Sequence, residues 1–293
     1  MAVPHRHRGD VGDLTLGMTF AAPIPFREAV GQLTARKLMP TSLGSRELAQ
    51  LAQAIKRQSF FSARTTIEGL LERYQTGIES ILNPKQVLRE GALETVTEGH
   101  TAASLRKFIK EYLREIEYAP DEDDRGTIKD LGSDARINLV VKTNVELAQG
   151  AGNFVQGNAP EVIDAWPAQE LYRQEARTTP RNWDGTTPEG DKALTGFGSR
   201  WMQAAQAVGD VDAARIMEET GRMVALKSSG IWQALGDFED GLGNPYPPYA
   251  FNSGMWVKDV TRRESEALGL ITSGEAARPA DFDFGSLFKG PEA

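Results

Sequence analysis

Apolar residues recur every three or four positions through the first half of the chain, which is the spacing that forms one apolar face on an α-helix. The pattern predicts helices at 48–55, 67–82, 105–116 and 134–149. Asn83-Pro84 ends the second of these, and Pro84 can also open a further helix over 85–97. The segment from Ser45 to Gly157 is therefore predicted to be a bundle of about five helices.

The pattern changes beyond position 159, where all 5 tryptophans and 9 of the 15 prolines are found. Short runs of β-forming residues between prolines and glycines predict strands at 162–166, 171–175 and 222–226. Thr261-x-x-Glu264 is a capping box with Gly269 after it, which predicts a short helix between them. The chain as a whole is predicted to have an α+β fold, an N-terminal helical bundle followed by a small mixed module of short strands and helices.

With 293 residues, 40% of them hydrophobic, the chain can form one large or two ordinary domains. We divide it into a basic N-terminal arm (1–44), the helical bundle (45–157), a Trp- and Pro-rich module (158–271) and a loose C-terminal tail (272–293). It contains no run of about 18 apolar residues, and its first ten residues lack the apolar centre of a secretory signal. No membrane contact is therefore expected.

Charge is unevenly distributed along the chain. The net charge is −8, yet residues 1–64 contain nine Lys or Arg and only four Asp or Glu. A basic region of this kind can contact packaged DNA or an acidic protein surface. The candidate residues for such a contact are Arg6, Arg8, Arg27, Arg36 and Lys37. An ordinary solubilising arm explains the same charge equally well.

Residues that carry common catalytic chemistry are scarce. The chain has no cysteine and three histidines, which excludes disulfides and thiolate zinc sites and leaves little material for a histidine triad. The acidic segment 121–132 is similar to a calcium loop, but Arg125 and Gly132 stand where that loop needs oxygen ligands. No catalytic residue, metal site or cofactor is therefore predicted.

Two further features are interpreted as structural. The glycines of 150–157 lack the dinucleotide-binding spacing and follow a helix, so a helix end is expected there. Asn144 falls on an otherwise apolar helical face, where a buried amide must be hydrogen-bonded. We expect Asn144 to pin the bundle to the domain that follows it.

Several segments between residues 133 and 270 are informative as an ordered set. They are Ser133-Asp-Ala-Arg-Ile-Asn-Leu-Val-Val-Lys-Thr-Asn144, Ala165-Trp-Pro-Ala-Gln-Glu-Leu-Tyr-Arg173, Ala176-Arg-Thr-Thr-Pro-Arg-Asn-Trp183, Arg222-Met-Val-Ala-Leu, Ile231-Trp-Gln-Ala-Leu and Asn244-Pro-Tyr-Pro-Pro-Tyr-Ala-Phe-Asn252. In this order they resemble the helix and compact module of the phage Mu F-type minor head (head morphogenesis) proteins. The resemblance covers about half of the chain.

The resemblance implies a minor capsid protein of a tailed phage or prophage that acts in head assembly near the portal. It implies a place in the virion head, with the host cytoplasm as the site of assembly. The implied partners are portal and capsid or scaffold proteins, with packaged DNA as a further contact, and there is no small-molecule substrate and no catalytic residue. The aromatic surface of the module is expected to bind these partners, with Tyr246, Tyr249 and Trp256 as hot spots.

The chain departs from this family at its cysteines. Many members carry two cysteine pairs at metal-binding spacing, whereas this chain has Thr179, Asn182, Ser253 and Met255 at or near those positions. It therefore resembles a cysteine-less, divergent member whose module must be held by apolar packing. The apolar side chains available for that purpose are Trp183, Trp232 and Phe251.

Two other functions stay open from the residues alone. A capsid-associated hydrolase that uses only carboxylates would need a cluster of buried acids in one cleft, and Asp237 with Asp240 or Glu218 with Glu219 are visible pairs. A nucleic-acid-binding module would need a contiguous face of Lys and Arg on the bundle.

Overall fold

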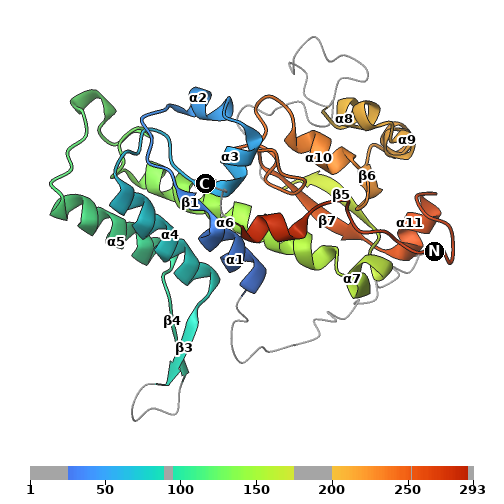
Figure 1. Cartoon of the computed structure of the whole chain (residues 1–293), viewed down its shortest axis with the longest axis horizontal. Helices are drawn as coiled ribbons and strands as arrows, with labels where there is room; N and C mark the ends of the chain where they lie inside the picture. The colour runs from blue at the N-terminus through green and yellow to red at the C-terminus, as the bar shows by residue number, and fades with distance from the viewer. Residues whose placement is uncertain (1–25, 89–94, 175–199, 252, 290–293) are drawn as a thin grey trace, which may run out of the picture.

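The computed structural model describes residues 26–88, 95–174, 200–251 and 253–289, and Figure 1 shows their arrangement. A long helix, α6 (Asp134–Gly157), runs through the middle of the molecule, with other helices of the N-terminal half and a three-stranded sheet around it. Helices combined with small sheets make this an α+β fold, as predicted. Arg6, Arg8 and Trp183 lie outside the described residues.

The core of the first half lies between α6 and three other helices, α1 (Arg27–Ala35), α4 (Glu68–Leu82) and α5 (Ala102–Glu115). Leu33, Ile78 and Ile109 are fully buried there. For α4, α5 and α6 this is the packing that the apolar spacing predicts. The start of α5 is also as predicted, because the side chain of Thr101 accepts a hydrogen bond from the Ser104 N–H.

The predicted helix over 85–97 is wrong. These residues form a β-hairpin in which β3 (Lys85–Leu88) pairs antiparallel with β4 (Thr95–Glu98). The β-branched run Thr95-Val-Thr favours extended backbone, and this preference outweighs the helix-starting signal of Pro84.

The predicted helix over 48–55 is interrupted. The structure has two short helices here, α2 (Ser45–Ala49) and α3 (Gln53–Gln58). Only Leu48 of the predicted apolar stripe is buried, and Ile55 is 42% exposed. The segment therefore lacks the continuous apolar contact that would hold one straight helix.

Residues 26–44 do not belong to a separate basic arm. Ala29 and Leu33 of α1 are fully buried in the helical core. Directly after α1, β1 (Lys37–Leu38) pairs in parallel with β2 (Ser59–Phe60). The predicted arm boundary at Gly44 is wrong, because apolar residues in this segment outweigh its positive charge, and the bundle includes the chain from Phe26.

The C-terminal tail is packed rather than loose. Its 3-10 helix, η3 (Phe284–Phe288), contacts α1, and Leu287 is buried. The ring of Phe284 lies 5.2 Å from that of Phe154 in α6, and the ring of Phe282 lies 5.4 Å from it. The prediction of a loose tail is wrong because its aromatic residues bury apolar area, although the rest of the segment is polar and contains glycines.

The C-terminal half is organised around a sheet with the order β6-β5-β7. The central strand, β5 (Ala168–Arg173), pairs antiparallel with both β6 (Met223–Leu226) and β7 (Met255–Val260). Two of these strands were predicted approximately. One face packs on α8 (Arg200–Val208) and α10 (Ile231–Gly236), and Val224 packs with Ile216 of α9 (Val211–Thr220) on the other.

The centre of this half is a pair of tryptophans. Trp201 and Trp232 are fully buried and meet edge to face, with ring centroids 5.5 Å apart. Phe251, which the sequence analysis placed in this core, is instead half-buried and lies 6.4 Å from the ring of Phe61. Trp232 therefore has the expected packing role and Phe251 does not.

Two short helices complete the module. The predicted strand at 162–166 is wrong, because Pro160 occupies the first turn of a helix, α7 (Pro160–Ala165), where its fixed backbone angle is favourable. The predicted capped helix is confirmed as α11 (Arg262–Ala267). The side chain of Thr261 accepts a hydrogen bond from the Glu264 N–H, and Gly269 follows with a φ of 72°.

Glu170 in the central strand joins two neighbouring elements through charge. It is buried, and its Oε2 atom lies 2.5 Å from Arg222 and 3.2 Å from Lys258. Burial raises the pKa of Glu170, but hydrogen bonds from the two cations outweigh burial and hold the pKa below its usual value. A lowered pKa means that the carboxylate stabilises the fold above the pKa of the unfolded chain. That contribution is lost as the pH falls below this value.

We therefore expect the free energy of unfolding to decrease as the pH is lowered from about 5 to about 3. Glu170→Gln should lower it at neutral pH by about 1–3 kcal/mol, because Lys258 loses a carboxylate partner and Arg222 loses one of two. The same variant should show a shallower decrease in acid. Urea unfolding at several pH values measures both effects, with exposed Glu239→Gln as the control. An acid dependence as steep as that of the parent would contradict the role of Glu170.

Candidate functional site

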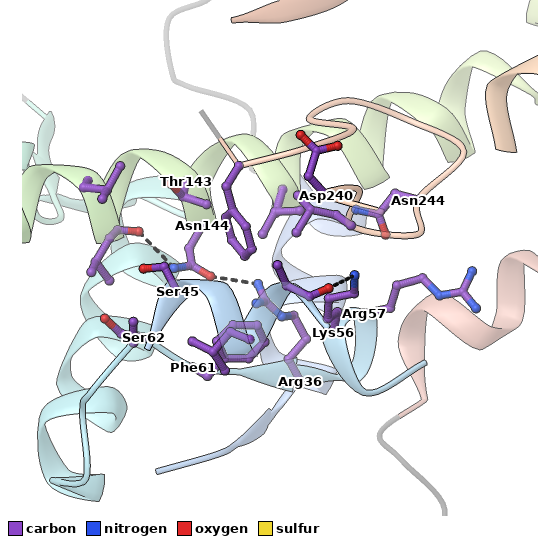
Figure 2. Close-up of a pocket in the computed structure, with 18 of the residues that line it drawn as sticks. Arg36, Ser45, Lys56, Arg57, Phe61, Ser62, Thr143, Asn144, Asp240 and Asn244 are labelled. Atoms are coloured by element: carbon purple, nitrogen blue, oxygen red, sulfur yellow. Dashed lines mark hydrogen bonds between the residues drawn. The ribbon is translucent and has the colours of Figure 1, made fainter. Parts of the chain in front are cut away.

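A cavity of about 380 Å³ lies between α6, the N-terminal segment and the loop before β7. Figure 2 shows the side chains that surround it. Its floor is one stripe of α6, formed by Arg136, Leu139, Val140, Thr143, Asn144 and Leu147. These positions are three or four residues apart, so one face of the N-terminal half of α6 is turned towards the cavity.

The remaining walls combine apolar and basic side chains. Leu48, Phe61, Leu242 and Phe251 provide apolar surface. The basic side chains are Arg36, Arg46, Lys56, Arg57 and Arg136. Asp240 is the one carboxylate among the described residues that line the cavity. Arg46 and Ser45 are exposed, so the cavity meets the surface at α2.

Arg36 is fixed by hydrogen bonds and by a contact with an aromatic ring. It is 6% exposed, its Nε and Nη2 atoms donate to the Ser59 carbonyl at 3.0 and 2.9 Å, and its Nη1 donates to Oδ1 of Asn144 at 2.9 Å. The guanidinium also lies 5.3 Å from the ring centroid of Phe60. Asn144 in turn donates to the Val140 carbonyl at 2.9 Å. The buried amide is therefore satisfied as predicted, but its side-chain partner is Arg36 from the N-terminal segment and not a residue of the following domain.

Lys56 and Arg136 are buried in the same manner. Lys56 Nζ donates to the carbonyls of Ala49 at 3.1 Å and Gly241 at 2.6 Å. Arg136 Nη2 donates to Ser62 Oγ at 2.6 Å and to the Ala63 carbonyl. All the acceptors of Lys56 and Arg136 are neutral, as are those of Arg36.

The electrostatics of the three cations reflect this burial. Burial lowers the pKa of Arg36 to about 10, so the side chain is still charged at neutral pH. Burial also lowers the pKa of Lys56 and of Arg136. A cation with a carboxylate partner shows the opposite direction, as Arg222 does where Glu170 raises its pKa.

Three buried polar atoms on the cavity wall have no hydrogen-bond partner. They belong to Gln32 (Oε1), Arg136 (Nε) and Asn244 (Oδ1). Each of these side chains is less than one-tenth exposed, at 4%, 8% and 2% respectively. Buried polar groups in folded proteins are normally paired, so these three atoms are unsatisfied within the wall, behind the surface of the cavity.

The structure separates the residues that the sequence analysis grouped as basic contacts. Arg27 and Lys37 are exposed and available to a partner. Arg36 is not, because it is buried under α6, and its predicted role in DNA or portal contact is wrong. A charged residue between the apolar positions of α1 and β1 is drawn into the core with them.

Two of the three predicted aromatic hot spots are also wrong. Tyr246 is 2% exposed and Tyr249 is fully buried, while Trp256 is half-buried. The loop that carries the tyrosines is buried from 241 to 250, and the Pro247 carbonyl lies against Gly150 of α6. The expected helix end at 150–157 is confirmed, since these residues form the last turns of α6, which ends at Gly157, and Gly150 there admits this loop.

Sequence reasoning missed Lys56 and Arg136 as site residues. The available signal was a polar side chain at an apolar position of a helix, which Asn144 and Arg136 share at a spacing of eight residues on α6. That spacing places both on one face, but only the tertiary structure shows that α3 brings Lys56 to the same cavity.

Comparison of the chain with protein families, with curated proteins and with solved structures finds no match. Among the described residues, α6 is the longest helix, and neither it nor any other is both long and apolar enough to cross a bilayer.

Proposed function

We propose that this protein is a minor head protein of a tailed phage or prophage that acts in capsid assembly beside the portal. One observation carries the proposal. The segments that resemble the Mu F-type module are dispersed along the chain, yet the described ones between 165 and 251 pack together as one unit, while 133–144 packs in the core of the helical bundle. Such a unit is what a shared module requires.

The contacts of this unit can be followed from one segment to the next. The segment 165–173 supplies the central strand β5, and 222–226 supplies β6, which pairs with it. The segment 231–235 supplies α10, whose Trp232 packs under the sheet. The buried loop 244–251 joins this sheet to α6, where Phe154 lies 5.3 Å from the ring of Tyr246. Successive segments between 165 and 251 are therefore connected by contacts within one packed unit.

The partner contacts belong to residues that remain accessible. Trp256 lies on an edge strand, half-buried beside a second cavity of about 310 Å³, and Arg27 and Lys37 are exposed. An aromatic side chain at the edge of a hollow is typical of interface hot spots. Portal and capsid or scaffold proteins are the proposed partners, with packaged DNA as a further contact of the basic residues.

Two rival functions lack their required observation in the described part of the chain. On α5, Lys107 pairs with Glu111 and Lys110 pairs with Asp134, so positive charge there alternates with negative. The buried carboxylates are Asp130 and Glu170, which lie on different elements and each accept hydrogen bonds from the protein. These observations therefore favour neither nucleic-acid binding, which would need a contiguous basic face, nor a carboxylate hydrolase, which would need an acidic cleft.

The proposal is tested in a phage or prophage that encodes this chain. Deleting the gene should abolish infectious particles, and the parental gene supplied in trans should restore them. Trp256→Ala should weaken capture of the protein by heads about 30-fold, the equivalent of about 2 kcal/mol for a hot-spot residue. Quantitative mass spectrometry of purified particles measures its copy number.

The control is Phe108→Ala, which removes another half-buried ring from α5, on the side of the molecule away from the sheet in Figure 1. Both variants must show the parental circular dichroism spectrum. A silent gene deletion, together with particles that never contain the protein, would reject the head-assembly proposal. Normal copy number for Trp256→Ala alone would reject only this residue as the contact.

A further inference from the structure

We propose that the cavity beneath α6 binds a small organic anion, a carboxylate or phosphate group attached to a short apolar body. This inference does not depend on the head-assembly proposal. It comes from the charge balance of the cavity, from its unused hydrogen-bond donors and from the distribution of apolar surface along its floor.

The charge balance is the first argument. Five cations and one carboxylate line the cavity, in a chain whose overall net charge is −8. The carboxylate of Asp240 is already engaged by Arg200, at 2.6 and 3.0 Å. The neutral acceptors around Arg36 and Arg136 satisfy hydrogen bonds but do not neutralise charge. Asp240 and Asp237, by contrast, partly offset the charge of Lys56. Buried charges are normally paired, so an anion between these groups would offset the free-energy cost of burying their positive charge.

Unused donors are the second argument. A guanidinium has five N–H bonds and an ammonium has three. The hydrogen bonds of Arg36 involve one bond each from Nε, Nη1 and Nη2, and those of Lys56 involve two from Nζ. Donors therefore remain on both Arg36 and Lys56. Carboxylate and phosphate oxygens accept several such bonds at once, which distinguishes them from a single-acceptor ligand such as an alcohol.

Shape is the third argument. The stripe from Arg136 to Leu147 covers twelve residues of α6, so its ends are about 16 Å apart at the helical rise of 1.5 Å per residue. In Figure 2 Arg36, Asn144 and Lys56 point into the space beneath α6. Leu139 and Val140, one turn before Asn144 on the same helix, provide apolar floor. An anionic head near Arg36 and Lys56, with an apolar body along this floor, matches both surfaces. The volume of about 380 Å³ is in the range of small-molecule sites.

The experiment uses the full chain and three defined probes at constant ionic strength, which sodium chloride maintains. Hexanoate carries both a carboxylate and an apolar body, inorganic phosphate carries only the anion, and hexan-1-ol carries only the apolar body. Titration calorimetry and thermal melts should show saturable binding and a raised melting temperature with hexanoate. Phosphate should bind more weakly than hexanoate, and hexan-1-ol should not bind measurably.

Two variants locate the binding. Lys56→Gln should weaken hexanoate binding about tenfold or more, because a charged hydrogen-bond donor is lost. Asn144→Asp places a carboxylate beside Arg36 and should abolish binding, since the internal anion replaces the external one. Because Asn144→Asp adds a partner for a buried charge, it keeps the test valid if Lys56→Gln fails to fold. The control is Lys107→Gln on α5, whose side chain is 78% exposed.

The outcomes are decisive in both directions. Binding of hexanoate by the parent and by Lys107→Gln, with loss in Asn144→Asp, supports the proposal. If neither hexanoate nor phosphate binds, the proposal is overturned, and the cavity is then a solvent-filled space. Equal affinity in the parent and in Asn144→Asp, or equal binding of hexan-1-ol and hexanoate, would also overturn it, because charge would then have no part in recognition.

Discussion

Replacing Trp201 by alanine is expected to lower the free energy of unfolding by about 3–5 kcal/mol. The side chain is fully buried, packs edge to face on Trp232 and donates a hydrogen bond from its indole nitrogen to the Ala213 carbonyl at 3.1 Å. Alanine would leave a large cavity and an unpaired buried carbonyl. Urea unfolding followed by circular dichroism measures the change.

The matched control for this prediction is Trp166→Ala, which removes the same side chain from a position that is 41% exposed. Its effect should be about 0.5 kcal/mol or less. Similar losses for the two variants would mean that burial of Trp201 does not set its contribution, and the packing described for the C-terminal half would be wrong.

Gly150→Ala is expected to destabilise the protein by about 3 kcal/mol, although alanine normally favours a helix over glycine by about 1 kcal/mol. A Cβ atom on Gly150 would lie 1.7 Å from the Pro247 carbonyl oxygen, so α6 and the buried loop would have to separate. The partner is backbone and not the end of a flexible side chain, which makes relief of the clash costly.

The same substitution at Gly157, in the last turn of α6, provides the control. There the nearest atom to an added Cβ is Nζ of Lys227 at 3.4 Å, which is an ordinary van der Waals contact. Gly157→Ala should therefore be neutral or slightly stabilising in thermal melts. A melting temperature for Gly150→Ala equal to that of the control would show that the loop does not press against the helix.

The parts of the fold that could be predicted from sequence are those where local signals and packing agree. In α5 an apolar stripe, the Thr101 cap and burial of Ile109 all indicate the same helix. In 85–98 the signals conflicted, since Pro84 suggests a helix start and Thr95-Val-Thr suggests a strand. The conformation of such a short segment is decided by the pairing of its two strands, and the spacing of apolar residues does not reveal that pairing.

The candidate site was largely beyond sequence reasoning. Arg36 was interpreted as a surface cation because charged residues are usually exposed, and its burial depends on Asn144, more than 100 residues later in the chain. The tyrosines of 244–251 were interpreted as interface residues because they occur among prolines, which usually mark surface loops. The glycines of α6 create the space for that loop, and this relation exists only between distant segments.

The contact between α1 and η3 has a consequence for how the chain acquires its structure during synthesis. Phe288 lies against Gly31, at 3.1 Å from the position of an added Cβ, so these elements meet across roughly 250 residues. At about 5–20 residues per second, a ribosome would release α1 tens of seconds before η3 is made. During that interval the surface of α1 that η3 covers is open to water or to a chaperone. Closure of this contact is therefore expected to follow the folding of the helices made between α1 and η3.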